Sequence, residues 1–278
     1  MPASDSEITT FETASAGGTA LHGQIEGDRR DLVLLHGLTA TRRNVVQGSR
    51  LLARQGCRLI AYDARGHGES DPADEPPAYE YSDLVGDLRA VLAELEIERP
   101  VLVGSSMGAA TAMAFALAAP EAVAALVQIT PAYDGAPHEA SLEHWDSLAE
   151  ALAQEDVDAF VERSGASELP ERFRDGALLA TRQRLERHRH LRAVSDALRV
   201  VPRSSAFHGL EPLERLEVPV LVVGSRDESD PGHPLAVAEE YAKRLPRGRL
   251  VVEEPGKAPL AWQGAQLSRT IAEFLDQL

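Results

Sequence analysis

Short apolar runs alternate with amphipathic segments along most of the chain. Apolar runs bounded by Gly or Pro are typical of strands covered on both faces of a sheet, and they lie at residues 31–37, 57–63, 123–130, 218–224, 249–253 and the start of 101–119. Apolar residues recur at helical spacing in 42–55, 82–97, 234–245 and 265–275. This alternation predicts right-handed crossovers and a mostly parallel sheet flanked by helices, the α/β class.

The first part of the chain predicts a different pairing. Residues 7–13 and 20–26 alternate polar and apolar side chains around Gly17-Gly18, a pattern typical of two half-buried antiparallel strands. We expect them at one edge of the sheet. A glycine-rich loop at 64–70 and a turn of prolines and acids at 72–77 follow the strand at 57–63.

The alternation breaks between about residues 132 and 212. No strand pattern occurs there, and helical patterns occupy 140–153, 157–164, 171–188 and 191–200. The simplest account is a helical insertion over the carboxyl edge of the sheet, where open α/β sheets bind ligands; a peripheral lobe without a binding role is the alternative. We therefore expect an α/β core from 1–133 and 213–278, with a helical cap insertion at 134–212.

Composition and charge limit the function classes. The chain has 278 residues, and its 28 basic against 44 acidic residues give a net charge of −16, which disfavours nucleic-acid binding. The basic cluster at 182–190 is interpreted first as a solvated face and second as an anion site. Cys57 is the single cysteine, so we expect a small buried side chain and no intrachain disulfide.

The N-terminal residues lack both a basic segment and an apolar segment of the secretory kind. The apolar stretch at 101–119 is split by Gly104-Ser105-Ser106 and does not indicate a membrane span. We therefore expect a cytoplasmic protein without a membrane partner.

Chemistry concentrates at Gly104-Ser105-Ser106-Met107-Gly108, between an apolar strand and an Ala-rich helix. In a G-x-S-x-G turn the glycines permit a close approach of strand and helix, and the central serine is exposed as a nucleophile. Ser106 is that residue, whereas Ser105 is interpreted as a small residue required for space. A plain Gly/Ser loop is the alternative interpretation.

Several motifs occur in one order and resemble the α/β-hydrolase fold family across nearly the whole chain. They are Leu35-His36-Gly37, the segment 62–70, the turn at Ser106 and the segment 224–231. The resemblance implies that Ser106 attacks an acyl carbonyl of a small-molecule substrate and that the amides of Leu38 and Met107 bind the oxyanion. It implies no metal and no organic cofactor. His36 and His67 have no catalytic role in it, and we expect them to hold their loops.

The resemblance places the catalytic acid at Asp227, where a carboxylate would orient an imidazole. Asp230 is the second choice, and we expect it to cap the helix that begins near residues 231–234.

The general base departs from the family pattern. The family places a histidine in the loop after the last strand, whereas this chain has Lys257 there and no histidine after His233. His233 could face Ser106 directly or across a water. Lys257 could act in a Ser–Lys arrangement if it were desolvated. A histidine of the helical insertion is the third choice; the candidates are His138, His144 and His208.

The function predicted from these residues is a serine hydrolase of a small ester, thioester or lactone, with Ser106, Asp227 and His233 as its catalytic residues. A non-hydrolytic ligand-binding or regulatory protein is the competing class, because Lys257 occupies the histidine position. Cleavage of a carbon–carbon bond or acyl transfer is a further possibility, since the same turn serves these reactions.

Overall fold

Eight strands form one sheet in the order β1-β2-β4-β3-β5-β6-β7-β8. The computed structural model describes residues 7–74 and 78–278, so residues 1–6 and part of the predicted 72–77 turn lie outside it. The strands are β1 Ile8–Ala14, β2 Ala20–Glu26, β3 Arg30–Leu35, β4 Cys57–Tyr62, β5 Val101–Ser105, β6 Ala125–Ile129, β7 Val220–Gly224 and β8 Gly248–Val252. β2 pairs antiparallel with β1 and β4, and the other pairs are parallel. The predicted α/β class and antiparallel edge are confirmed.

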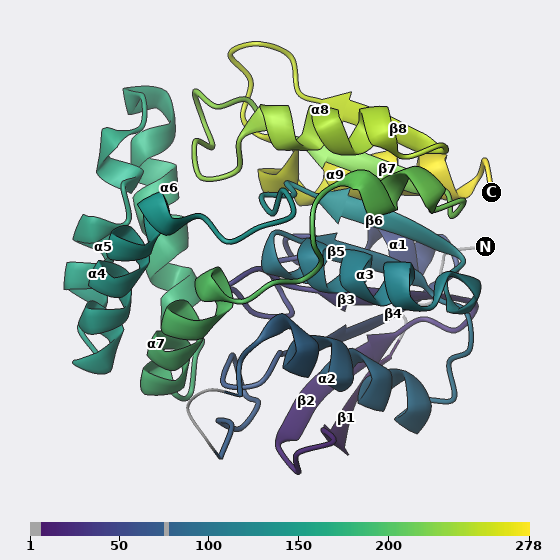
Figure 1. Ribbon diagram of the computed structural model, residues 1–278, viewed down its shortest axis with the longest axis horizontal. Coiled ribbons are helices and arrows are strands. Elements are labelled where there is room, and N and C mark those ends of the chain that lie inside the picture. Colours follow the sequence, from purple (N-terminus) through teal and green to yellow (C-terminus); the bar gives the residue numbers. More distant parts are fainter. Residues whose placement is uncertain (1–6, 75–77) are drawn as a thin grey trace.

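Helices cover both faces of the sheet (Figure 1). Successive strand residues point to opposite faces, so Leu102 packs with α2, α3 and α8, whereas Val101 and Val103 pack with α1 and α9. These helices are α1 Leu51–Arg54, α2 Tyr81–Glu94, α3 Met107–Ala118, α8 Leu235–Arg244 and α9 Gly264–Leu275. The result is a helix–sheet–helix sandwich.

The predicted helix over 42–55 is mostly wrong, because only α1 is helical there. Gln47 and Gly48 both have positive φ values, 49° and 70°, which an α-helix does not allow. Upstream, the amide of Thr41 donates to the side chain of Asn44 at 2.9 Å, a local bond that competes with helix formation. The segment therefore forms turns after β3.

Four helices lie between β6 and β7, and Figure 1 places them beyond one end of the sheet. They are α4 Leu142–Ala153, α5 Val157–Arg163, α6 Glu171–Leu185 and α7 Leu191–Val200. They share an apolar cluster of their own, and Ala193 and Ala197 of α7 also pack with Met107, next to Ser106. This helical segment therefore lies against the G-x-S-x-G turn and is not remote from it.

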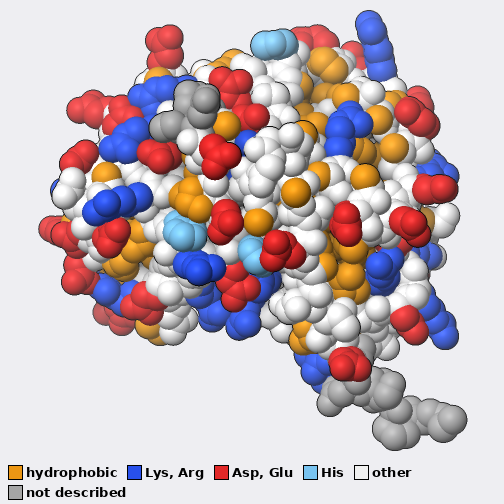
Figure 2. Space-filling model, turned by 90° about the horizontal axis from the view of Figure 1, so that it is seen from below, with side chains coloured by type: hydrophobic (Ala, Val, Ile, Leu, Met, Phe, Trp, Pro, Cys, Tyr) orange, Lys and Arg blue, Asp and Glu red, His pale blue; other side chains and the backbone are white. Residues whose placement is uncertain are grey.

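Burial modifies one expectation from composition and confirms another. Acidic and basic side chains are interspersed on the face in Figure 2. The 182–190 cluster is only partly a solvated face, because Leu185 and His188 within it are buried. Cys57 is buried and unpaired, as predicted.

Within the described ranges, no helix combines the length and apolarity that crossing a membrane requires.

Candidate active site

Ser106 stands at a sharp turn between β5 and α3. Its φ and ψ are 51° and −112°, an unfavourable backbone conformation for a residue with a side chain. The two glycines make it possible, because a Cβ on Gly104 would lie 2.3 Å from the carbonyl oxygen of Gly108, and one on Gly108 would lie 2.2 Å from that of Leu35. The chain therefore has the strand–turn–helix geometry of a nucleophile elbow at Ser106.

The loop after β3 lies against this elbow. A Cβ on Gly37 would lie 3.3 Å from the Cβ of Ser106, so the backbones of the loop and the elbow approach each other closely. Thr39 has a φ of +64°, and the side chain of Leu38 packs against the helical segment. Leu38 and Met107 thus lie on the two segments that flank Ser106. The amide of Met107 is at the positive end of the α3 dipole.

His36 fixes the start of this loop. Its Nδ1 lies 2.8 Å from the carbonyl oxygen of Gly37, and its Nε2 accepts from the amide of Ala64 at 2.9 Å. These partners set the tautomer with the proton on Nδ1. Burial, with His67 nearby, lowers the pKa of His36 to about 3. His36 is therefore a neutral loop holder, as predicted.

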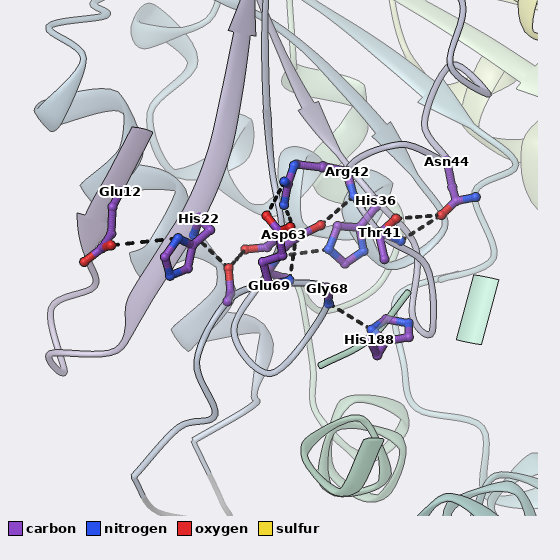
Figure 3. Close-up of polar contacts among 12 residues, drawn as sticks. Glu12, His22, His36, Thr41, Arg42, Asn44, Asp63, Gly68, Glu69 and His188 are labelled. Atoms are coloured by element: carbon purple, nitrogen blue, oxygen red, sulfur yellow. Dashed lines mark hydrogen bonds and ion pairs between the residues drawn. The ribbon is translucent and has the colours of Figure 1, made fainter. Parts of the chain in front are cut away.

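An ion-pair network with a buried centre, Asp63 and Arg42, and one exposed member, Glu69, holds the next loop, after β4 (Figure 3). Asp63 pairs with the guanidinium of Arg42, which also pairs with Glu69. The carboxylate of Asp63 also accepts from the amides of Arg42 and Glu69 at 2.7 and 3.0 Å. A Cβ on Gly68, whose φ is +53°, would lie 2.1 Å from this carboxylate. The 62–70 motif is therefore a scaffold that fixes two loops to each other.

His188 joins the helical segment to both loops. Its Nε2 lies 2.9 Å from the carbonyl oxygen of Thr39, and its Nδ1 accepts from the amide of Gly68 at 2.9 Å. Figure 3 shows the bond to Gly68. Burial lowers the pKa of His188 to about 3, so the ring is neutral, with the proton on Nε2. The sequence does not reveal this role, because His188 lies within a basic cluster that resembles a solvated face.

His67 completes a row of three histidine rings, 5.1 Å from His36 and 5.6 Å from His188 between centroids. Its Nδ1 lies 2.9 Å from the carbonyl oxygen of Arg65, which confirms the predicted loop-holding role. Burial also lowers the pKa of this ring.

The structure reverses the contacts predicted for the two aspartates after β7. Asp227 is exposed, and its Oδ1 accepts from the amide of Leu235 at 2.8 Å, so it caps α8. Asp230, the predicted cap, lies instead 2.7 Å from Nδ1 of His233. The reason is spacing, since Asp230 and His233 are the first and fourth residues of one turn, which the amide of His233 closes by donating to the carbonyl oxygen of Asp230 at 3.1 Å. The imidazole partner of His233 is thus Asp230.

Ser106 Oγ forms no hydrogen bond with any other residue in the described ranges. Ser106 and His233, the base predicted to face it, therefore form no direct hydrogen bond. Lys257 is exposed on the loop after β8, so it is not desolvated as a Ser–Lys mechanism requires. The three histidines of the insertion that were considered as bases are also exposed; they are His138, His144 and His208.

Comparison with known proteins places this geometry in a family. Residues 32–169 match the family model described as alpha/beta hydrolase fold. A Bacillus subtilis (strain 168) protein named as a candidate 2-succinyl-6-hydroxy-2,4-cyclohexadiene-1-carboxylate synthase is 28% identical over 264 residues, which cover 89% of this chain and 90% of that protein.

Solved structures share the whole architecture. A thermophilic esterase from Thermogutta terrifontis has a TM-score of 0.79 at 23% identity and covers 97% of this chain and 98% of its own. An enol-lactonase from Burkholderia xenovorans LB400 has a TM-score of 0.77 at 21% identity and covers 95% and 99%. At these identities the likeness shows the fold alone. The sheet order, the elbow and the matching family model together show that the chain belongs to the α/β-hydrolase fold family and is related to its hydrolases.

Proposed function

We propose that the chain is a serine hydrolase that cleaves a small carboxylic ester, thioester or lactone through an acyl-enzyme on Ser106. The observation that carries this proposal is the strained elbow, with φ of 51° at Ser106 and the Gly37 loop packed against it. Strain at a serine is retained only where the surroundings impose it, and such positions cluster at reaction centres. The elbow presents the hydroxyl above the sheet for attack on a carbonyl.

The amides of Leu38 and Met107 are the proposed oxyanion donors. Two fixed N–H groups aimed at developing negative charge lower a barrier by several kcal/mol, because they need no reorganisation. His36, His188 and the Asp63 network support this arrangement, since they hold the loop that carries Leu38.

His233 is the proposed general base, and Asp230 its orienting carboxylate in place of Asp227. The 2.7 Å contact at Nδ1 would keep the proton there and leave Nε2 as the acceptor. Both residues follow β7 at the carboxyl edge, the same edge as Ser106. Because Ser106 and His233 share no direct hydrogen bond, a bridging water or closure around substrate would complete the proton path.

Residues 134–212 are proposed to act as a cap over this site. The support is the packing of α7 against Met107 and of Leu38 against the helical segment. Such a cover would exclude water from the acyl-enzyme and shape the substrate pocket.

A ligand-binding protein without turnover is the second candidate. It is favoured by the exposed Lys257 at the position of the family histidine and by the separation of Ser106 from a base.

Turnover of an activated ester separates the two candidates. We expect 4-nitrophenyl acetate to be hydrolysed by the wild type with a burst of nitrophenol, and at least about 1,000-fold more slowly by Ser106→Ala. Equal rates for both proteins would exclude the serine mechanism. Saturable ligand binding with no turnover would favour the second candidate.

A further inference from the structure

Helix α6 crosses the carboxyl edge of the sheet. Near the start of α6, the ring of Phe173 packs edge-on against the ring of Trp262, with 6.3 Å between the ring centroids. Trp262 lies in the segment that follows β8. Just past its end, His188 contacts Thr39, after β3. In the strand order β3-β5-β6-β7-β8, the strand that carries the elbow lies between these two anchors. The helix between them therefore passes over the ends of β5, β6 and β7.

Arg184 lies on the side of α6 that faces the core. It is about three helical turns after Phe173, so these two side chains share one stripe of the helix, and His188 follows four residues later, beyond the end of α6 at Leu185. Its position near His188 places it toward the β5 end of the crossing. It is also close enough to Asp230 for their charges to interact. Arg184 thus lies on the side of the helical segment that is turned toward the Asp230–His233 pair.

The guanidinium of Arg184 lacks a counter-ion. Its Nε is buried and has no hydrogen-bond partner within residues 7–74 and 78–278, and no carboxylate there lies within 4 Å to form an ion pair. Asp230 is already hydrogen-bonded to His233. Burial consequently lowers the pKa of Arg184.

Arg184 as a whole residue is partly buried, and two arginines that are buried more deeply show how this chain pairs such a charge. Arg65 is 5% exposed and holds Asp87 with two bonds of 2.8 and 2.6 Å. Arg42 is 8% exposed and pairs with Asp63 and Glu69. An unpaired buried cation costs several kcal/mol, and a planar guanidinium is suited to bind a carboxylate through two parallel hydrogen bonds.

We propose that Arg184 binds an anionic group of the substrate, a carboxylate remote from the bond that Ser106 attacks. The preferred substrate is then an ester, thioester or lactone that carries a free carboxylate. This inference rests on the proposed function for its substrate class, although the binding of a carboxylate by Arg184 can be tested without turnover.

A matched pair of esters tests the substrate class. 4-Nitrophenyl hydrogen glutarate carries the free carboxylate, and 4-nitrophenyl methyl glutarate replaces it with a neutral methyl ester. We expect the wild type to prefer the acid at least about 10-fold in kcat/KM, and Arg184→Met to lose that preference mainly through KM. Arg182→Met is the control, because Arg182 lies on the same helix and pairs with Asp158 at the surface. Arg184→Lys should retain part of the preference.

Glutarate alone provides the readout without turnover. It should raise the thermal midpoint of the wild type and of Arg182→Met, and should leave that of Arg184→Met unchanged. Hydrolysis of both esters without preference, with no midpoint shift by glutarate, would overturn the anion site and leave the proposed function standing. A midpoint shift that depends on Arg184, without hydrolysis of either ester, would support the site and overturn the proposed function.

Discussion

The carboxyl edge of the sheet has two unequal sides. The nucleophile side comprises residues 36–42, 63–70 and 104–108, and the base side comprises residues 225–234 and 254–259. On the nucleophile side, buried histidines and the Asp63 ion pairs fix each loop to the next. On the base side, Asp227 and Lys257 are exposed, and His233 has one carboxylate partner. The loops around Ser106 are therefore held by more buried contacts than the loops around the proposed base, His233.

The largest expected difference between the two sides is the loss of stability caused by adding a methyl group to a glycine. Gly108→Ala would bring a Cβ to 2.2 Å from the carbonyl oxygen of Leu35, so we expect a loss of roughly 3 kcal/mol or more in unfolding free energy. Gly232→Ala on the base side meets nothing within 4 Å and should change stability by less than about 0.5 kcal/mol. Urea unfolding measures both. Similar losses in the two variants would contradict the contrast.

The two aspartates of the base side should separate in activity. Asp230→Asn removes the carboxylate that orients His233, and we expect kcat/KM to fall about 100-fold or more. Asp227→Asn weakens the α8 cap and should cost about 1 kcal/mol of stability with less than about a twofold change in kcat/KM. The reverse order in ester kinetics would restore Asp227 as the catalytic acid.

The neutral histidines of the nucleophile side predict acid sensitivity. In the unfolded chain each protonates near its ordinary pKa of 6.5, but in the fold the pKa of His36 and of His188 is about 3. The unfolded state binds more protons as pH falls, so each ring should cost about 2 kcal/mol of stability between pH 7 and 5. His188→Gln should reduce the pH dependence of urea unfolding by that amount, whereas an unchanged dependence would show that His188 is not held neutral.

The smallest expected effect is at the position where the family has its histidine. Lys257→Met removes an exposed ammonium, and we expect kcat/KM and its pH profile to change by less than about twofold. A loss of 100-fold or more would identify Lys257 as the base.

The sequence predicted the turn at Ser106 and the loop-holding role of His36, whereas it exchanged the contacts of Asp227 and Asp230, for a physical reason. Tight turns demand glycine and fixed spacings, so the Gly104–Gly108 turn and the 62–70 loop are visible in the sequence. The choice between Asp227 and Asp230 depends on which way each side chain points within one loop, which spacing does not determine. His188 and Arg184 were hidden among charged neighbours, because burial of a polar residue by tertiary packing has no local pattern. The helix predicted over 42–55 was too long for another reason, since its apolar spacing suits a helix that the positive φ at Gln47 interrupts, and only α1 is helical.

The rate at which a fluorophosphonate labels Ser106 tests the central claim most directly, that His233 takes the proton of this serine. Intact-mass spectrometry follows the reaction at pH 7.5 in the wild type, in His233→Ala and in Ser106→Ala. We expect one adduct per wild-type chain, none in Ser106→Ala, and labelling at least about 100-fold slower in His233→Ala. Labelling of His233→Ala at the wild-type rate would contradict it.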